Sequence, residues 1–508
     1  MLKSNLKPFY IFLLTFILVS FIRSPQSNRP LSYHHEFCTA VALRVMDIWW
    51  ENGITEYNFA PVMTYGAEAN KFINNHATGS MQMVDEEGNY YYISHPPLAY
   101  YMPYILFNIF QSPPNVFGLQ FFQWIIHLLC GILIFYMAKL LIRKVKLPEY
   151  AEMFGIVCFL IYMLNPATLW FQGNVYMSDT LVQLFFISSL FLWWNMLTDK
   201  PFISQKLAFP LFLVSGFLGG LTSWLSYLLV AGLLLHAVFF TEKKQKMVIS
   251  SVLFGVAHLL SIGITFYLYS RINGSEAVIA EWFQRFGQRG VSGNSFLNIF
   301  SHLKVAVVNY GVNFFAIIVF IIASAFLAYP TIKNFKHKKV FIKLLLSTLL
   351  PVLLIHLILP NYVGHDFTTI YLAPFLAFLA GALWLILYIK FKNNPQAFYL
   401  GSVIALLFSV MNFYVINLPG ELSIKGKEYK TYQQNGNFIA RFKEQDAVFF
   451  IEQSPANPQL VYYAKRNVRY VESPADAQKF LEERNYDRGL LFLYDKNGLI
   501  YRFEEIQR

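Results

Sequence analysis

MSDTLVQLFFISSLFLWWNML, residues 177–197, is the segment of the chain that decides its fold. It contains no charged residue after Asp179, and it has the length of about 20 residues that a helix needs to cross a bilayer. The rest of the chain agrees with it, since 56% of the 508 residues are hydrophobic and only 14% are charged. A soluble domain has about 25% charged residues. The sequence therefore excludes an ordinary cytosolic enzyme and predicts a membrane protein.

Ten other runs of the chain have the same apolar character. Together the runs predict a polytopic α-helical protein with about eleven transmembrane helices. A shorter run that contains proline, residues 98–111, is predicted to be a helix at the membrane interface. The predicted transmembrane runs are residues 8–22, 117–138, 151–168, 177–197, 207–222, 225–240, 247–269, 305–329, 341–359, 369–389 and 398–418.

Basic residues give this predicted membrane protein an orientation. The chain has 40 Lys and Arg against 29 Asp and Glu, a formal charge of +11, and its basic residues recur in alternate loops. The short loops between them, 169–174, 223–224 and 360–368, contain no Lys or Arg. Because positively charged short loops stay cytoplasmic, we expect a cytoplasmic N-terminus and an extracytoplasmic C-terminus in a bacterial-type plasma (inner) membrane. The charge therefore indicates topology rather than nucleic-acid binding.

Two larger regions are predicted on the outer side of the membrane. The first belongs to the transmembrane domain, residues 1–418, and is an outer loop with interfacial helices over 23–116. Within it, residues 33–50 have an apolar stripe at helical spacing, and Ser32 is available as the N-cap. We therefore expect an amphipathic helix that lies in the plane of the interface.

The second outer region, residues 419–508, is predicted to be a small extracytoplasmic α/β domain. Ser473 and Pro474 provide the N-cap and first position of a helix. A terminal hairpin is predicted from the pattern LLFLYD, then KNG, then LIYRFEE. The other predicted elements are strands at 446–452 and 468–472 and helices at 458–466 and 474–484.

Several polar clusters fall together on the predicted outer side. Because sites are commonly built from loops at one face of a rigid scaffold, these residues are candidates for a functional site. Structural explanations exist as well: Glu36 gains from the dipole in the first turn of its helix, and Asp179 can cap its own helix. The apolar runs contain few acids or arginines, which disfavours an ion-coupled transporter. The candidates are His35, Glu36, His95, Asp179, Arg285, Arg289, His365 and Asp366.

Three motifs give the chain a family resemblance. HPPLAYY (95–101), MSDTL (177–181) and GHDFTTIYLAPFLAFLAG (364–381) occur in this order. They resemble the PPL element, the pass-opening Asp and the late H-x-Y/F…L-x-P-x-L-A segment of GT-C glycosyltransferases, in the branch of protein O-mannosyltransferases and lipid A aminoarabinose transferases. The resemblance covers roughly residues 1–418. Two positions depart from the family, since His35-Glu36 stands in place of its usual Asp-Glu pair and Ser94-His95 precedes PPL in place of an acid or Lys.

The resemblance implies an inverting transfer of a sugar from a polyprenyl-phosphate donor to an acceptor hydroxyl on the outer face. Glu36 or His35 would take the acceptor proton. Arg285 or Arg289 would bind the phosphate of the leaving group. These roles are expectations that follow from the family.

The remaining candidates, His95, Asp179, His365 and Asp366, are expected to bind substrate. Among them, Asp179, His365 and Asp366 would orient sugar hydroxyls or a divalent metal, which is the one cofactor left open. The expected partners are the lipid-linked donor, membrane lipids and a glycan, lipid or protein acceptor, with no nucleic acid. Two alternatives stay open. One is a non-catalytic glycan- or lipid-binding relative, and the other is a flippase or transporter of lipid-linked saccharides.

Overall fold

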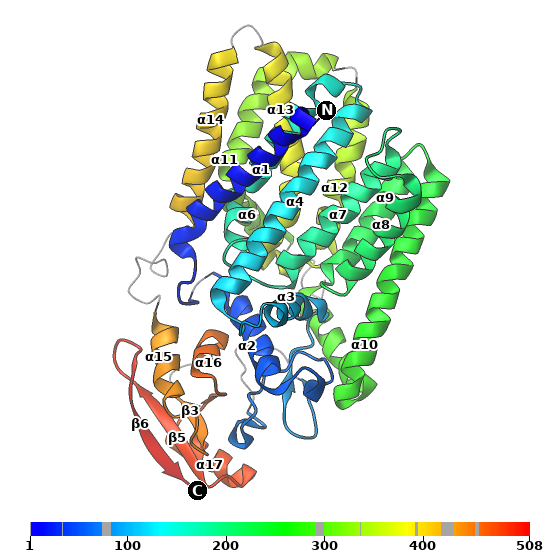
Figure 1. The fold of residues 1–508 in the computed structure, drawn as a ribbon. Helices are drawn as coiled ribbons and strands as arrows, with labels where there is room; N and C mark the ends of the chain where they lie inside the picture. Colours follow the sequence, from blue (N-terminus) through cyan, green and yellow to red (C-terminus); the bar gives the residue numbers. More distant parts are fainter. Residues whose placement is uncertain are drawn as a thin grey trace.

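The structure, a computed structural model, describes residues 2–32, 34–73, 83–290, 299–335, 337–391, 395–417, 430–452 and 457–508. Figure 1 shows a bundle of long helices with a smaller unit of sheet and helices beyond one end of it. Helices α2 (Glu36–Asn52) and α3 (Leu98–Ile109) lie between the bundle and this smaller unit.

All eleven predicted transmembrane runs contain helix. Eight helices in the described part of the chain are long and apolar enough to cross a membrane, so the chain is a multi-pass membrane protein. The helices of the bundle are α1 (Leu2–Arg23), α4 (Val116–Lys144), α5 (Ala151–Met163), α6 (Pro166–Phe171), α7 (Ser178–Leu197), α8 (Gln205–Gly220), α9 (Leu225–Phe240), α10 (Lys244–Arg289), α11 (Ile299–Asn334), α12 (Lys338–Ile358), α13 (Ala373–Lys390) and α14 (Pro395–Asn412).

Three of the predicted runs form shorter helices. Residues 151–168, predicted as one pass, are two helices, because α5 ends at Met163 and α6 begins at Pro166. Proline has no N–H to donate and fits the first position of a helix. Asn165 caps α6 by accepting a hydrogen bond from the backbone N–H of Ala167 at 2.8 Å. Helices α8 and α9 have 16 residues each and pack against their longer neighbours in the bundle.

Helix α10 extends well beyond the predicted run 247–269 and contains 46 residues. Asn273 and Gly274 interrupt its helical backbone, and Gly274 has a φ of 78°, which glycine adopts without strain. After this break the helix continues past α8 and α9 to the level of α2 and α3 (Figure 1). The second half of α10 therefore reaches the first outer loop.

Helix α2 begins at Glu36, later than the predicted start at residue 33. His34 and His35 precede it with φ values of 41° and 68°, and this left-handed backbone cannot continue into a right-handed helix. The N-cap position is His35, which makes no side-chain cap bond, so Ser32 is not the cap.

The polar face of α2 is covered rather than free to meet water. Arg44 is 2% exposed and donates from Nη2 to Oδ1 of Asn467 at 2.6 Å. Asp47 pairs with Lys465. Both partners belong to the C-terminal unit, so α2 joins that unit to the bundle.

The C-terminal unit contains a four-stranded sheet in the order β4-β3-β5-β6. Strand β3 is parallel to β4 and β5, and β6 is antiparallel to β5. All the predicted strands and helices and the terminal hairpin are present, together with α15 (Thr431–Ala440), whose polar sequence gave no helix prediction. The predicted domain start at residue 419 lies outside the described residues. The other elements are β3 (Val448–Ile451), α16 (Pro458–Ala464), β4 (Arg469–Tyr470), α17 (Pro474–Arg484), β5 (Arg488–Tyr494) and β6 (Ile500–Gln507).

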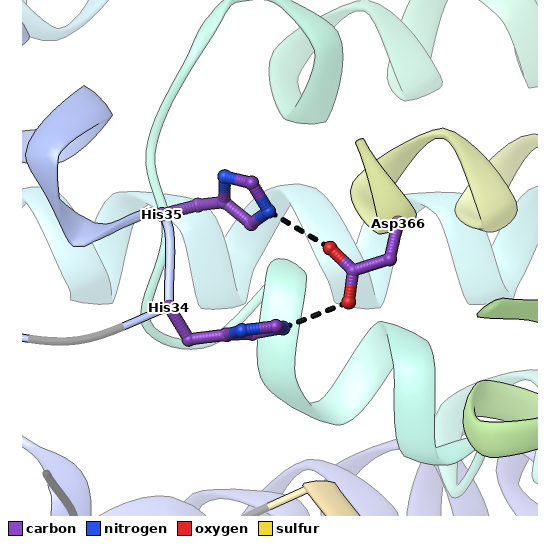
Figure 2. Close-up of side chains that lie close together, drawn as sticks. All are labelled: His34, His35 and Asp366. Atoms are coloured by element: carbon purple, nitrogen blue, oxygen red, sulfur yellow. Dashed lines mark hydrogen bonds and ion pairs between the residues drawn. The ribbon is translucent and has the colours of Figure 1, made fainter. Parts of the chain in front are cut away.

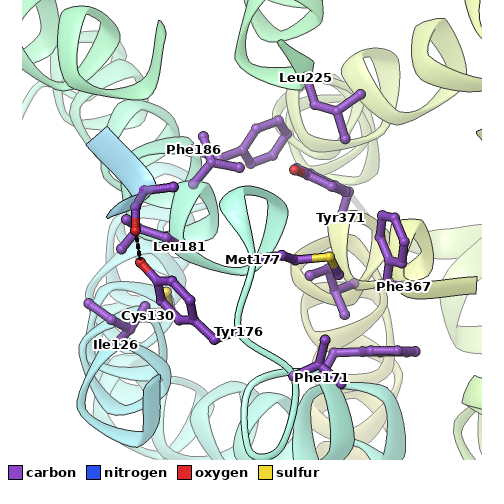
Figure 3. Packing of buried hydrophobic residues seen from close by; sticks show 14 of the residues in the cluster. Ile126, Cys130, Phe171, Tyr176, Met177, Leu181, Phe186, Leu225, Phe367 and Tyr371 are labelled. Carbon is purple, nitrogen blue, oxygen red and sulfur yellow. Dashed lines mark hydrogen bonds between the residues drawn. The ribbon is translucent and has the colours of Figure 1, made fainter. Parts of the chain in front are cut away.

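Buried side chains pack closely around the start of α7 (Figure 3). Cys130 of α4, Phe186 of α7 and Tyr371 are all fully buried. The hydroxyl of Tyr176 also donates to the carbonyl oxygen of Ala99 and so ties the start of α7 to α3. This packing fixes the position of the first turn of α7.

Candidate functional site

A cavity of about 640 Å³ lies at the end of the bundle where α2, α7, α9, α10 and residues 358–367 meet. Pockets for small ligands have volumes of about 300–1,000 Å³. Five of the eight predicted site residues line this cavity, and they come from four separate parts of the chain. These residues are His95, Asp179, Arg285, Arg289 and His365.

Asp179, the second residue of α7, is 1% exposed and is held by hydroxyl groups. Ser223 Oγ donates to its Oδ1 at 2.7 Å, and Tyr362 Oη donates to its Oδ2 at 2.6 Å. Tyr371 Oη lies 3.4 Å from Oδ1. A carboxylate offers about four acceptor positions, so Asp179 has room for a further donor from the cavity. The helix N-terminus also favours its negative charge.

His95 is fixed at the wall of the cavity by its backbone and its ring. Tyr269 Oη donates to the His95 carbonyl oxygen at 2.6 Å, and His95 Nδ1 lies 3.0 Å from Ser178 Oγ. Burial lowers the pKa of His95 to about 4; the charge of Asp179 acts in the opposite direction, and the two cavity arginines lower the pKa further. The imidazole is therefore neutral at pH 7.

Arg285 and Arg289 provide positive charge on the side of the cavity formed by α10. Arg285 Nε lies 3.5 Å from Glu281 Oε1. Arg285 Nη2 is buried and has no hydrogen-bond partner among the described residues. Arg289 Nη1 contacts His365 Nε2, and its guanidinium lies 5.3 Å from the centre of the Tyr362 ring. Guanidinium groups with unused N–H donors are suited to an anion, because they form strong charge-assisted hydrogen bonds.

The opening of the cavity on the α10 side is apolar. Phe283 and Phe286 both line the cavity, and they are 74% and 58% exposed. Large exposed aromatic side chains on a membrane helix are suited to contact with lipid. The cavity thus combines charged groups inside with an apolar entrance.

His35 and Asp366, two further predicted site residues, do not line the cavity but form a cluster with His34 (Figure 2). The rings of the two histidines point toward the carboxylate. His34 Nε2 lies 2.8 Å from Asp366 Oδ2, and His35 Nε2 lies 2.8 Å from Oδ1. The His35 ring is 6.0 Å from the ring of His365, so this cluster is next to the cavity.

Glu36, the remaining predicted residue, is fully buried and is not part of the cavity wall. Its Oε1 lies 2.7 Å from Arg29 Nη2, and its Oε2 accepts the backbone N–H of Ser32 at 2.8 Å. The next residues of α2, Phe37 and Cys38, do line the cavity. The expected catalytic role of Glu36 stays a prediction, but its carboxylate is engaged by the protein on both oxygens.

Known structures resemble the fold of this chain, although no protein-family model and no curated protein sequence matches it. Apo ArnT from Cupriavidus metallidurans has a TM-score of 0.59 and 11% identity, covering 97% of this chain and 94% of that chain. ArnT bound to undecaprenyl phosphate has a TM-score of 0.60 and 12% identity, covering 96% and 93%. AglB, the oligosaccharyltransferase of Archaeoglobus fulgidus in complex with an inhibitory peptide and a dolichol-phosphate, has a TM-score of 0.59 and 11% identity, covering 95% and 69%. The chain has the GT-C fold.

The GT-C fold confirms the predicted fold class, including the small C-terminal α/β part. The sequence did not reveal the residues that surround Asp179. Ser223 lies in the short predicted outer loop 223–224, and Tyr362 and Tyr371 flank the GHDF segment. Ser223 and Tyr362 lie in predicted outer loops, which was a usable signal, whereas Tyr371 lies at the start of the predicted run 369–389. The hydroxyl contacts of all three to Asp179 depend on how distant helices pack.

Proposed function

We propose that this chain is a membrane glycosyltransferase that moves a sugar from a polyprenyl-phosphate donor to an acceptor hydroxyl on the outer face, with inversion. The observation that carries the proposal is the composition of the cavity. It joins a carboxylate, two guanidinium groups and an apolar, exposed entrance in one space. Transfer from a lipid-linked sugar phosphate to a hydroxyl uses all three: cations for the phosphate, an apolar surface for the lipid and a carboxylate for the acceptor proton.

Arg285 and Arg289 bind the phosphate of the donor in this proposal. Negative charge grows on the phosphate as the bond to the sugar breaks, and fixed cations in a water-poor site stabilise that charge. Arg285 Nη2 is a buried donor without a partner among the described residues. Phe283 and Phe286 lie within one turn of Arg285 on the same helix and offer an apolar surface to the isoprenoid. Undecaprenyl phosphate bound to ArnT provides a parallel in a protein of the same fold.

Asp179 takes the proton of the acceptor hydroxyl in this proposal. It is the one acidic side chain on the cavity wall among the described residues. A base must reach the proton it removes, and Glu36 is excluded from the cavity by its contacts with Arg29 and Ser32. His95 is neutral and is placed to accept or donate a hydrogen bond to a sugar hydroxyl.

The outer-face location is supported by the positions of the basic loops. Asp199 lies 3.4 Å from Lys144 and 3.6 Å from Lys243, so three predicted cytoplasmic loops meet. The N-terminus lies at one end of the bundle, whereas α2, α3 and the C-terminal unit lie at the other (Figure 1). We therefore assign the cavity end to the extracytoplasmic side of the inner membrane.

The test is transfer of labelled sugar from a set of polyprenyl-phosphate donors by the purified chain in lipid nanodiscs. We expect Asp179→Asn to lower turnover by about 10²–10⁴-fold, the range contributed by a general base. Glu36→Gln serves as the matched carboxylate-to-amide control and keeps most of the turnover per folded molecule. Equal turnover of Asp179→Asn and wild type would contradict the assignment of the base. Donor binding without turnover in wild type would favour a non-catalytic lipid-binding protein.

A further inference from the structure

The cluster of His34, His35 and Asp366 has a geometry that the proposed transfer does not use. Each residue offers one ligand atom, and these atoms all lie within 4.8 Å of one another. Asp366 and His35 meet although 331 residues separate them in the chain. We propose that these three side chains bind one divalent transition-metal ion of the zinc class.

The donor set selects this class of ion. Two imidazole nitrogens and one carboxylate oxygen are ligands that Zn²⁺ accepts, and three protein ligands leave a fourth position open. Mg²⁺ and Ca²⁺ prefer sites built from oxygen alone. Tetrahedral Zn²⁺ places its ligand atoms about 3.3 Å apart, whereas each imidazole nitrogen now lies 2.8 Å from a carboxylate oxygen. The N–O contacts must therefore lengthen slightly, and because the three ligand atoms already lie within 4.8 Å of one another, small shifts of the side chains reach this geometry.

The backbone and the surroundings hold these ligands in place. His34 and His35 are consecutive residues with φ values of 41° and 68°, a left-handed conformation that residues with a Cβ rarely adopt. It directs both rings toward one carboxylate (Figure 2). The rings of Phe171 and Phe367 lie 5.7 Å from His34 and 5.0 Å from His35. Apolar neighbours of this kind restrict water and so support metal binding.

The ion would join the start of α2 to the segment that follows α12. That segment also supplies Tyr362, the hydroxyl donor to Asp179, and His365, the partner of Arg289. Metal binding would therefore position one wall of the cavity. This positioning role rests on the proposed function, whereas binding of the ion does not.

The test uses the full chain purified without a histidine tag, stripped with EDTA and titrated with Co²⁺, whose visible absorption reports nitrogen and oxygen ligation. We expect one ion per chain, displaced by equimolar Zn²⁺ but not by Mg²⁺. His34→Gln, His35→Gln and Asp366→Asn each weaken binding at least tenfold. His337→Gln is the matched control, because His337 precedes α12 at the opposite end of this helix from residues 358–367.

Two results would overturn the proposal: no stoichiometric ion in monodisperse wild type, or binding that all three variants retain. X-ray absorption at the zinc edge of the wild type is an independent measurement, so the proposal is tested even when a variant aggregates. It is expected to show two imidazoles among the ligands, and a shell without imidazole contradicts the site. A chain that binds the ion but transfers no sugar contradicts the proposed function and leaves the metal site intact.

Discussion

Glu36 and Asp179 are both buried carboxylates in the first turn of a helix, but the protein balances their charges differently. Glu36 faces a cation, Arg29, at 2.7 Å. Asp179 is held by neutral hydroxyls of Ser223 and Tyr362. The ion pair of Glu36 and Arg29 therefore has a structural role. The Asp179 carboxylate contacts hydroxyl groups and, within the described part of the chain, no cation, so it can still attract the proton of a substrate in the cavity, which is why Asp179 suits catalysis better than Glu36.

The largest effect is expected when the cation is removed from Glu36. Arg29→Met keeps much of the side-chain volume but leaves a buried carboxylate without its counter-charge, a change that costs about 3–5 kcal/mol of stability. We expect a large drop in the thermal unfolding midpoint in detergent. The double variant with Glu36→Gln should recover part of the loss, because the uncompensated charge is then gone. A midpoint equal to that of wild type would show that the pair is not a structural link.

The next effect concerns the cations of the cavity. Arg285→Gln removes a guanidinium that has unused donors toward the cavity, and hydrogen bonds to charged groups contribute about 1.5–3 kcal/mol. We expect the KM for the polyprenyl-phosphate donor to rise by about 10–100-fold, with little change in the unfolding midpoint. The measurement is steady-state transfer over a range of donor concentrations. Gln284, its neighbour on the exposed side of α10, provides the control Gln284→Ala, which should leave KM unchanged.

Tyr362→Phe tests the hydrogen bond from a tyrosine hydroxyl to Asp179 without changing the rest of the cavity wall. The variant removes the 2.6 Å hydrogen bond to Oδ2 but keeps the ring beneath Arg289. Loss of one hydrogen bond to a charged group corresponds to about a tenfold fall in turnover. Tyr227→Phe, a tyrosine that lines the same cavity and donates to the carbonyl of His258 at 3.2 Å, is the comparison. If both variants lose turnover equally, the bond to Asp179 has no special role.

The sequence predicted the bundle well because long apolar runs and alternating basic loops are local patterns. They can be recognised without knowing which helices pack together. It also named five residues that line the cavity, since outer-loop placement alone gathers His95, Asp179 and His365 at one end. It could not place Glu36, because the pairing with Arg29 depends on left-handed backbone at two histidines between them. The extension of α10 was missed for a different reason, since polar residues after Tyr269 end the hydropathy signal while the helix continues.

The smallest expected effect is a pH dependence of stability that originates at His95. Its pKa is lowered from 6.5 to about 4 in the folded chain, chiefly by burial, so between these values the unfolded chain binds a proton that the folded chain does not. Stability is therefore complete above pH 6.5 and falls as the pH decreases toward 4. Between pH 7 and pH 5.5 this group accounts for about 1 kcal/mol. The measurement is the unfolding midpoint of wild type and of His95→Gln at pH 7 and at pH 5.5. The difference between the two proteins should be smaller at pH 5.5. Parallel curves would mean that His95 does not lie in the dry, hydroxyl-lined surroundings that distinguish the cavity from the ion pair at Glu36.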